Sequence, residues 1–363
     1  MEPIAGLNWF AARTRPAMLG LSVAVLVSAC ATRGPSSTPV VMPAPVHQEV
    51  TPKMAAARDA LGKMVAVQDR LYRVASPLLI NNADLCKTQA RNLLGFTAKN
   101  KFSYPSEFGE AAQSTLGLAE RLEVTSVLTG SGAARSGLRR GDRLLAAEGK
   151  ALPSGPGAET QAARLFGPLV GARASLKITI LRNGGEQTLS VPVTRACGFR
   201  VELGNSDNVN SYADGQRILL TRGMVDFAHS DEELAYVIAK GMAHNILGHA
   251  KTLRSSATLD SIIDNLVHPH PDLSMLIGSA GIKAMPQEMD GAADSLALYL
   301  LARAGYRIEN AGRFWQNLAD KYPATVLNGY TANHPASGFR IAAIAKTTAQ
   351  IKAKQAAGKP LLP

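Results

Sequence analysis

The residues with the clearest potential for chemistry lie between Asp231 and His249, in the segment DEELAYVIAKGMAHNILGH. A zinc-dependent hydrolytic site on a helix needs two histidines at i and i+4, so that both imidazoles face one metal. A glutamate beside the first histidine activates the bound water. Here the five corresponding residues, 240–244, read KGMAH, so only the second histidine, His244, is present. Taken alone, one histidine on an amphipathic helix is more often structural than a ligand.

The same segment carries the signals of a well-defined helix. Ser230 and Glu233 form an S-x-x-E capping box, which predicts a helix start. Apolar residues follow at helical spacing and predict a buried face: Leu234, Val237, Ile238, Met242, Ile246 and Leu247. A turn at Asp214-Gly215 and a strand at 216–221 are predicted just before it.

This region resembles the HtpX-like and CAAX-prenyl-protease-like zinc metallopeptidases, in particular their soluble periplasmic lipoprotein members. Three segments carry the resemblance, which covers about residues 200–345: VNSYADGQRILLTRGM with the helix above, EMDGAADSLALYLLARAGY at 288–306, and NHPASGFR at 333–340. The resemblance implies that Asp290 stands at the third zinc-ligand position, normally a glutamate, and that Asp294 supports the site without binding the metal itself. It also implies that His334 and Arg340 lie nearby.

The motif is degenerate where the chemistry should be. A Lys240 ammonium has no lone pair for Zn²⁺, and Gly241 cannot take a proton from water. Loss of a positioned base alone removes about 10²–10⁴ in rate. Zinc is therefore possible by family resemblance but is expected to be lost, and no catalytic residue is intact. Two arrangements stay open: Lys240 pairs with Asp290 in place of a metal, or His244, Asp290 and His334 form a substitute metal site that still lacks a base.

Three other histidines are weaker candidates. His249 is five residues beyond His244 and, on an ideal helix, points away from it by more than a quarter turn. His268 and His270 lie in VHPHPD, a proline-broken segment that predicts an exposed connection.

Residues 90–196 have a different pattern, with short β-branched strands and glycine-rich turns. The segment ASLKITILRNGGEQTLSVPV predicts two strands joined by RNGG. Together with GSGAARSGLRRGD at 130–142, it looks like a bacterial-type PDZ domain, which takes up an extended peptide or C-terminus as an added strand. The carboxylate-binding loop is either LLGF at 93–96 or LGL at 116–118, and a spacer domain with no peptide-binding role is the alternative.

The N-terminus predicts export. Arg13 and Arg15 precede AMLGLSVAVLVSAC, a run too short to span as a transmembrane helix and typical of a signal peptide. Its small residues before Cys30 resemble a bacterial lipoprotein signal, which implies residues 1–29 as the signal peptide and Cys30 as the lipidated residue. Ala31 after it implies the outer membrane, facing the periplasm. The alternative is an ordinary signal peptide with an incidental cysteine. A proline- and serine-rich tether, 30–53, and a helical lead-in, 54–89, follow.

Cys86 and Cys197 are then the remaining cysteines. Because thiols oxidise in an exported compartment, one disulfide is the simplest account, and two separate buried thiols are the alternative. The net charge of +11 comes without a long basic run or aromatic-basic interleaving, so nucleic acid is not expected as a partner.

The predicted architecture is α+β, with a mainly helical zincin-like metallopeptidase domain at 197–350 and a C-terminal tail at 351–363. Three functions are considered. The first is an envelope pseudopeptidase that binds proteins or peptides in envelope protein quality control. The second is an active zinc endopeptidase with a non-standard ligand set. The third is a PDZ peptide-binding module with a structural remnant domain.

Overall fold

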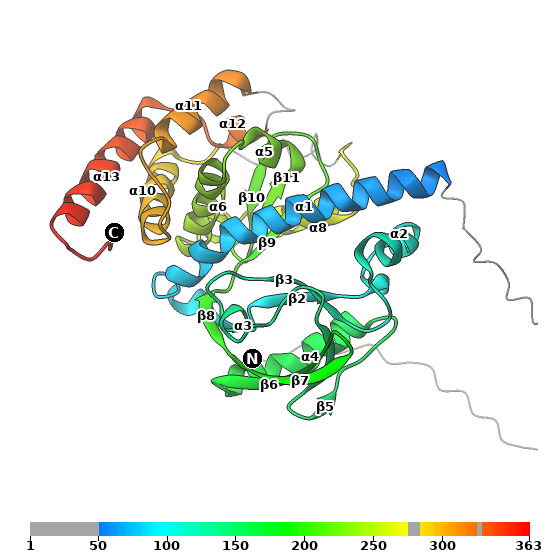
Figure 1. The fold of residues 1–363 in the computed structure, drawn as a ribbon. Coiled ribbons are helices and arrows are strands. Elements are labelled where there is room, and N and C mark those ends of the chain that lie inside the picture. Colours follow the sequence, from blue (N-terminus) through cyan, green and yellow to red (C-terminus); the bar gives the residue numbers. More distant parts are fainter. Residues whose placement is uncertain (1–50, 275–283, 325–328) are drawn as a thin grey trace, which may run out of the picture. The chain divides into compact units, whose positions relative to one another are not determined.

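The computed structural model describes residues 51–274, 284–324 and 329–363 (Figure 1). The expected signal peptide, Cys30 and all but the end of the tether lie outside the described residues. The described part is α+β, as predicted. Within it, no helix is both long enough and apolar enough to cross a membrane.

Helix α1 (Pro52–Asn81) starts two residues before the predicted helical lead-in, 54–89, and ends within it. It starts at Pro52 because the Thr51 side chain accepts a hydrogen bond from the Met54 N–H, and proline suits the first helical turn. Its C-terminal half contributes Leu71, Val74 and Leu78 to the hydrophobic core of the mainly helical domain at 198–356. The disulfide Cys86–Cys197 joins the segment after α1 to the end of strand β8 (Thr194–Cys197), which pairs with β1 (Ala90–Leu93).

Residues 94–193 form a β-rich unit with its own core. Its sheet is antiparallel, in the order β2-β3-β4-β6-β7, with β5 paired to β4. Its strands are β2 (Phe96–Lys99), β3 (Glu123–Val127), β4 (Arg143–Ala147), β5 (Lys150–Ala151), β6 (Ser175–Arg182) and β7 (Gly185–Pro192). Its α-helices are α2 (Ser106–Leu116), α3 (Gly132–Arg135) and α4 (Ala158–Ala172), and short 3₁₀ turns η1 (Lys87–Gln89) and η2 (Lys101–Ser103) lie before and within it.

The predicted hairpin in this unit is confirmed. Strands β6 and β7 pair over their full length, and the two residues between them, Asn183 and Gly184, both have positive φ. This is the backbone that a two-residue hairpin turn requires. Alternate residues of β6, Leu176, Ile178 and Ile180, are fully buried, which is the period expected of a strand with one face on a core.

Residues 198–356 form a mainly helical domain around a three-stranded sheet, in the order β10-β11-β9. The strands are β9 (Arg200–Gly204), β10 (Ser211–Ala213) and β11 (Arg217–Thr221). All five residues of β11 are buried, because it is the central strand and α6 packs on it. The helices are α5 (Arg222–Phe227), α6 (Asp231–Ile246), α7 (His249–Thr252), α8 (Ser256–Val267), α10 (Gln287–Arg303), α11 (Ala311–Lys321), α12 (Gly329–Asn333) and α13 (Gly338–Ala356).

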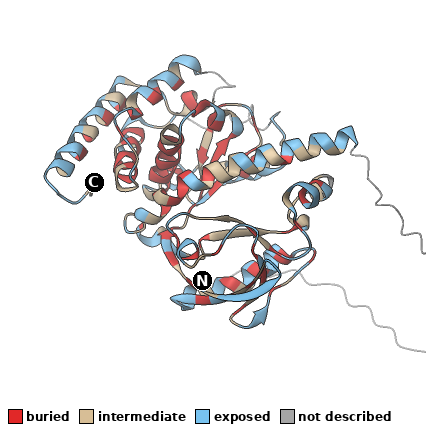
Figure 2. Ribbon diagram, in the orientation of Figure 1, coloured by how far each residue is buried: buried red, intermediate tan, exposed pale blue. Residues whose placement is uncertain are grey.

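Helices α6 and α10 pack against each other in the core of this domain (Figure 2, red). Helix α13 continues to Ala356, so the domain boundary expected at residue 350 falls inside a helix and is corrected to the end of α13. The reason is that Ile351 is fully buried and anchors the last turns of α13 to the core.

Candidate active site

Helix α6 carries the degenerate motif. The predicted capping box is confirmed: Ser230 Oγ accepts from the Glu233 N–H, and the Glu233 carboxylate accepts from the Ser230 N–H, each at 3.2 Å. This cap sets the start of the helix, and Lys240, Gly241 and His244 follow on its buried part. The helix ends at Ile246, and Gly248 (φ 68°) turns the chain into α7.

Helix α10 supplies two carboxylates one turn apart, Asp290 and Asp294, which are 0% and 2% exposed. Lys240 Nζ reaches both of them, lying 2.8 Å from Asp290 Oδ1 and 2.9 Å from Asp294 Oδ1. The lysine therefore bridges the two carboxylates that the family resemblance placed around a metal.

Arg340 of α13 provides the second cation of this buried cluster. Its guanidinium forms a fork with Asp294, with Nε 2.7 Å from Oδ2 and Nη2 3.1 Å from Oδ1. Its Nε also lies 3.2 Å from Asp290 Oδ2. The cluster thus contains two carboxylates and two basic side chains, so its charges can balance without a metal. Burial alone would raise the pKa of Asp290, but Lys240 and the neighbouring histidines hold that pKa well below its ordinary value.

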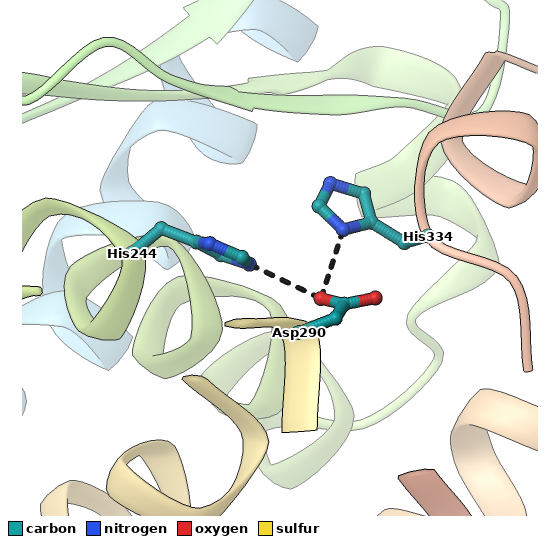
Figure 3. Close-up of side chains that lie close together, drawn as sticks. All are labelled: His244, Asp290 and His334. Atoms are coloured by element: carbon teal, nitrogen blue, oxygen red, sulfur yellow. Dashed lines mark hydrogen bonds and ion pairs between the residues drawn. The ribbon is translucent and has the colours of Figure 1, made fainter. Parts of the chain in front are cut away.

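Two histidines lie next to the same oxygen of Asp290 (Figure 3), and a third histidine contacts one of them. His334 Nδ1 lies 3.0 Å from Asp290 Oδ1, and His244 Nε2 lies 3.4 Å from it. His244 Nδ1 lies 2.9 Å from His249 Nδ1, so one of the two rings donates to the other. Burial lowers the pKa of His244 to about 4, and burial together with the neighbouring His244 lowers that of His249 to about 4.

The expectation that His249 points away from His244 is wrong. Ideal-helix geometry does not apply because Gly248 ends α6 in a left-handed conformation and restarts the chain as α7, which brings His249 back over His244. His268 ends α8, and neither it nor His270 lines the cavity described below.

A cavity of about 380 Å³ lies over this cluster. All three residues of the edge strand β10 line it, as do Lys240, Gly241 and the histidines His244, His249 and His334. The cavity therefore lies between the edge strand β10 and the buried cluster.

Two aromatic residues of the site were missed by sequence reasoning. Trp315 lies under Lys240, with Nζ 5.1 Å from its ring centre, and Tyr330 stacks on Trp315 with ring centres 5.6 Å apart. Tyr330 also packs on His334, with ring centres 4.8 Å apart, and it lines the cavity. No motif marks these residues, because Trp315 sits on an ordinary amphipathic helix and Tyr330 lies outside the quoted segments.

The residues present do not fit a zinc ion. The ligand atoms of His244, Asp290 and His334 lie within 4.8 Å of one another, close enough for a common cation. However, the buried ammonium of Lys240 lies 2.8 Å from the same Asp290 oxygen, and Zn²⁺ would need that oxygen at about 2.0–2.2 Å. A divalent ion and an ammonium cannot both occupy this position, and the first histidine ligand is absent.

The model of peptidase family M48 matches residues 187–348. A comparison with curated proteins found no match. Two solved structures are similar to part of the chain. The crystal structure of the HtrA3 PDZ domain bound to the phage-derived ligand FGRWV has 13% identity and a TM-score of 0.22, over 29% of this chain and 88% of that chain. The HtrA-type protease AlgW with a decapeptide has 25% identity and a TM-score of 0.22, over 29% of this chain and 30% of AlgW. Helices α6 and α10 and the His-Pro segment at 334–335 meet in one cluster within the matched residues, so residues 187–348 contain a metallopeptidase-like domain similar to peptidase family M48.

Proposed function

We propose that this protein is a pseudopeptidase, an M48-type domain that binds peptides or proteins without cleaving them. One observation carries the proposal: the Lys240 ammonium bridges Asp290 and Asp294 where the family holds its metal. Because Lys240 and Arg340 together balance the two carboxylates, the cluster has no remaining charge that would attract a divalent cation.

The second missing part is the general base. Position 241 is glycine, and the histidines nearest to it are held in contacts with Asp290 or with each other. Such a cleft still has a surface that can bind a peptide. It has neither a metal ion nor a general base that could activate water for hydrolysis. Binding therefore remains as the use of the cleft, with β10 as the strand that an extended segment would pair with.

The β-rich unit is proposed as a second peptide-binding module of the PDZ type. Its sheet ends at β2, and the segment LLGF at 93–96 leads directly into that edge strand. The competing segment, LGL at 116–118, is the end of α2, with Gly117 as the left-handed cap. Phe96 of β2 meets Phe166 of α4, with ring centres 6.3 Å apart, so the edge strand and α4 share an apolar floor. These features favour LLGF as the loop that receives a peptide carboxylate.

The cellular setting is proposed from the N-terminal sequence. Lipidation at Cys30 would anchor the chain in the bacterial envelope, at the outer membrane facing the periplasm, with the proline-rich tether as a spacer. The disulfide between Cys86 and Cys197 is compatible with such an oxidising compartment. A role in envelope protein quality control follows from family analogy.

The second candidate is an active zinc endopeptidase that uses His244, Asp290 and His334. The observation in its favour is that these three ligand atoms lie within 4.8 Å of one another. It requires Lys240 to leave a buried position with two carboxylate partners. The third candidate, in which the PDZ-type unit alone functions, predicts that substitutions in the cleft leave peptide capture unchanged.

Metal analysis of the soluble chain, residues 31–363, separates the first two candidates. The pseudopeptidase predicts far less than one zinc per chain after incubation with zinc and dialysis, and no casein degradation that a chelator inhibits. One zinc per chain together with chelator-sensitive degradation of casein would establish the endopeptidase instead.

A further inference from the structure

Helix α6 approaches the sheet most closely at Gly241. A Cβ atom placed on Gly241 would lie 2.6 Å from Ile218 Cγ2 and 3.4 Å from Ile218 Cγ1. Real Cβ atoms essentially never come as close as the first of these distances, so any side chain at position 241 requires a shift. The first carbon of a side chain at the position of the missing base would thus clash with Ile218.

Ile218 has little freedom to move away. It lies in the central strand β11, is fully buried, and pairs with Val201 of β9 and Ala213 of β10. Its branched Cβ restricts χ1, so Cγ2 cannot rotate out of the contact cheaply. A Cβ atom added opposite it therefore meets this packed strand.

The spacing between the helix and the strand is also held by hydrogen bonds one turn further along. The Asn245 side chain donates to the Arg217 carbonyl at 3.0 Å and accepts from the Gly215 N–H at 2.7 Å. Arg217 is in turn anchored by Asp214, with Nε 2.7 Å from Oδ2. These contacts lie directly before Ile218 in the chain, so α6 cannot simply lift off the strand to admit a side chain.

We propose that Gly241 and Ile218 are a coupled packing pair that closes the base position, so that the loss of peptidase chemistry is built into the packing of α6 on β11. The proposal rests on the proposed pseudopeptidase function and deepens it. The double substitution Lys240→His and Gly241→Glu, which restores the motif in the sequence, should then destabilise the domain. The new glutamate side chain cannot be accommodated until Ile218 is reduced in size.

A double-mutant cycle tests the packing pair without any metal or activity. In the mature chain, Gly241→Ala should lower the urea midpoint and raise the unfolding equilibrium constant at least tenfold, ~1.4 kcal/mol. In the Ile218→Ala background, the same Gly241→Ala change should be neutral or raise the midpoint, because alanine favours a helix over glycine. Gly62→Ala in α1, where nothing lies within 4 Å of the added Cβ, is the matched control and should raise the midpoint.

The proposal is overturned if Gly241→Ala stabilises the native chain as Gly62→Ala does, or if the effect of Gly241→Ala is equal with isoleucine and with alanine at position 218.

A second comparison uses the far-UV circular dichroism and the unfolding midpoint of the variant with the restored motif. Lys240→His with Gly241→Glu should be strongly destabilised, and addition of Ile218→Ala should recover part of that loss. If Ile218→Ala only adds to the loss, the pair is not coupled. Bound zinc and proteolytic activity in the unsubstituted chain would refute the proposed pseudopeptidase function. The double-mutant cycle would still measure the coupling between Gly241 and Ile218, so failure of one proposal can be distinguished from failure of the other.

Discussion

Lys240 and Asp290 form an ion pair in the interior of the M48-type domain, with Nζ 2.8 Å from Oδ1 and side chains that are 2% and 1% exposed. Such a pair is not by itself evidence of high stability, because removing both charges from water costs about as much as their attraction returns. Its importance is positional, since the lysine stands at a metal-ligand position and satisfies the carboxylates that a metal would need.

Removal of this cation should be costly. Lys240→Met keeps the apolar stem but leaves Asp290 and Asp294 with Arg340 as their remaining permanent cation, so we expect a loss of about 3–5 kcal/mol in the free energy of unfolding. The measurement is urea denaturation. The matched control is Lys63→Met, which breaks an exposed pair with Asp59 at 2.8 Å and should change stability by about 0.5 kcal/mol or less. Equal effects of the two substitutions would contradict this assignment.

The disulfide should contribute substantially to stability. Cys86 and Cys197 are 111 residues apart, and in the chain-entropy model a closed loop of this length stabilises the fold by about 4–5 kcal/mol. Replacing both cysteines by serine, or adding a reductant to the native chain, should lower the free energy of unfolding by a similar amount, measured as a lower urea midpoint. Detection of two free thiols in the unreduced, unfolded chain would show that the bond does not form.

Stability should depend on pH through the histidine pair. The folded-state pKa values of His244 and His249 are lowered to about 4, against about 6.5 in the unfolded chain. Between pH 6.5 and 4 the unfolded chain therefore binds protons that the folded chain does not, and stability falls as the pH falls through this window.

The test is the slope of the unfolding free energy against pH. His249→Asn removes one of the two protons and should reduce the slope between pH 6.5 and 4.5. The control is the slope above pH 7, where neither histidine differs in protonation between the two states, and it should match that of the native chain. An unchanged slope at low pH would contradict the burial argument.

Two glycine substitutions distinguish the candidate carboxylate loops. Gly95 has a φ of +84°, and an added Cβ would lie 2.4 Å from Ser131 Cβ, so Gly95→Ala should distort LLGF. Gly117 also has a positive φ, but nothing lies within 4 Å of an added Cβ. We expect Gly95→Ala to weaken capture of peptides with a free C-terminus at least tenfold, measured by fluorescence anisotropy, while Gly117→Ala costs only about 1 kcal/mol of stability. The reverse result would place the loop at 116–118.

Several features of the fold are determined by local sequence patterns. The capping box at Ser230 and the RNGG hairpin depend on a few neighbouring residues, so the sequence predicted both, and the structure has both. The resemblance to zinc metallopeptidases could also be recognised from three separated segments, and the model of peptidase family M48 matches residues 187–348, which contain them.

Tertiary structure decided what the altered residues do. The position of the Lys240 ammonium between Asp290 and Asp294 depends on how α6 packs against α10, which no local pattern specifies. The contact of His249 with His244 depends on a single left-handed glycine, Gly248, that breaks the helix geometry assumed from spacing. The close approach of Gly241 to Ile218 joins a helix to a strand more than 20 residues earlier, and only the packed fold shows that a Cβ at position 241 would meet Ile218.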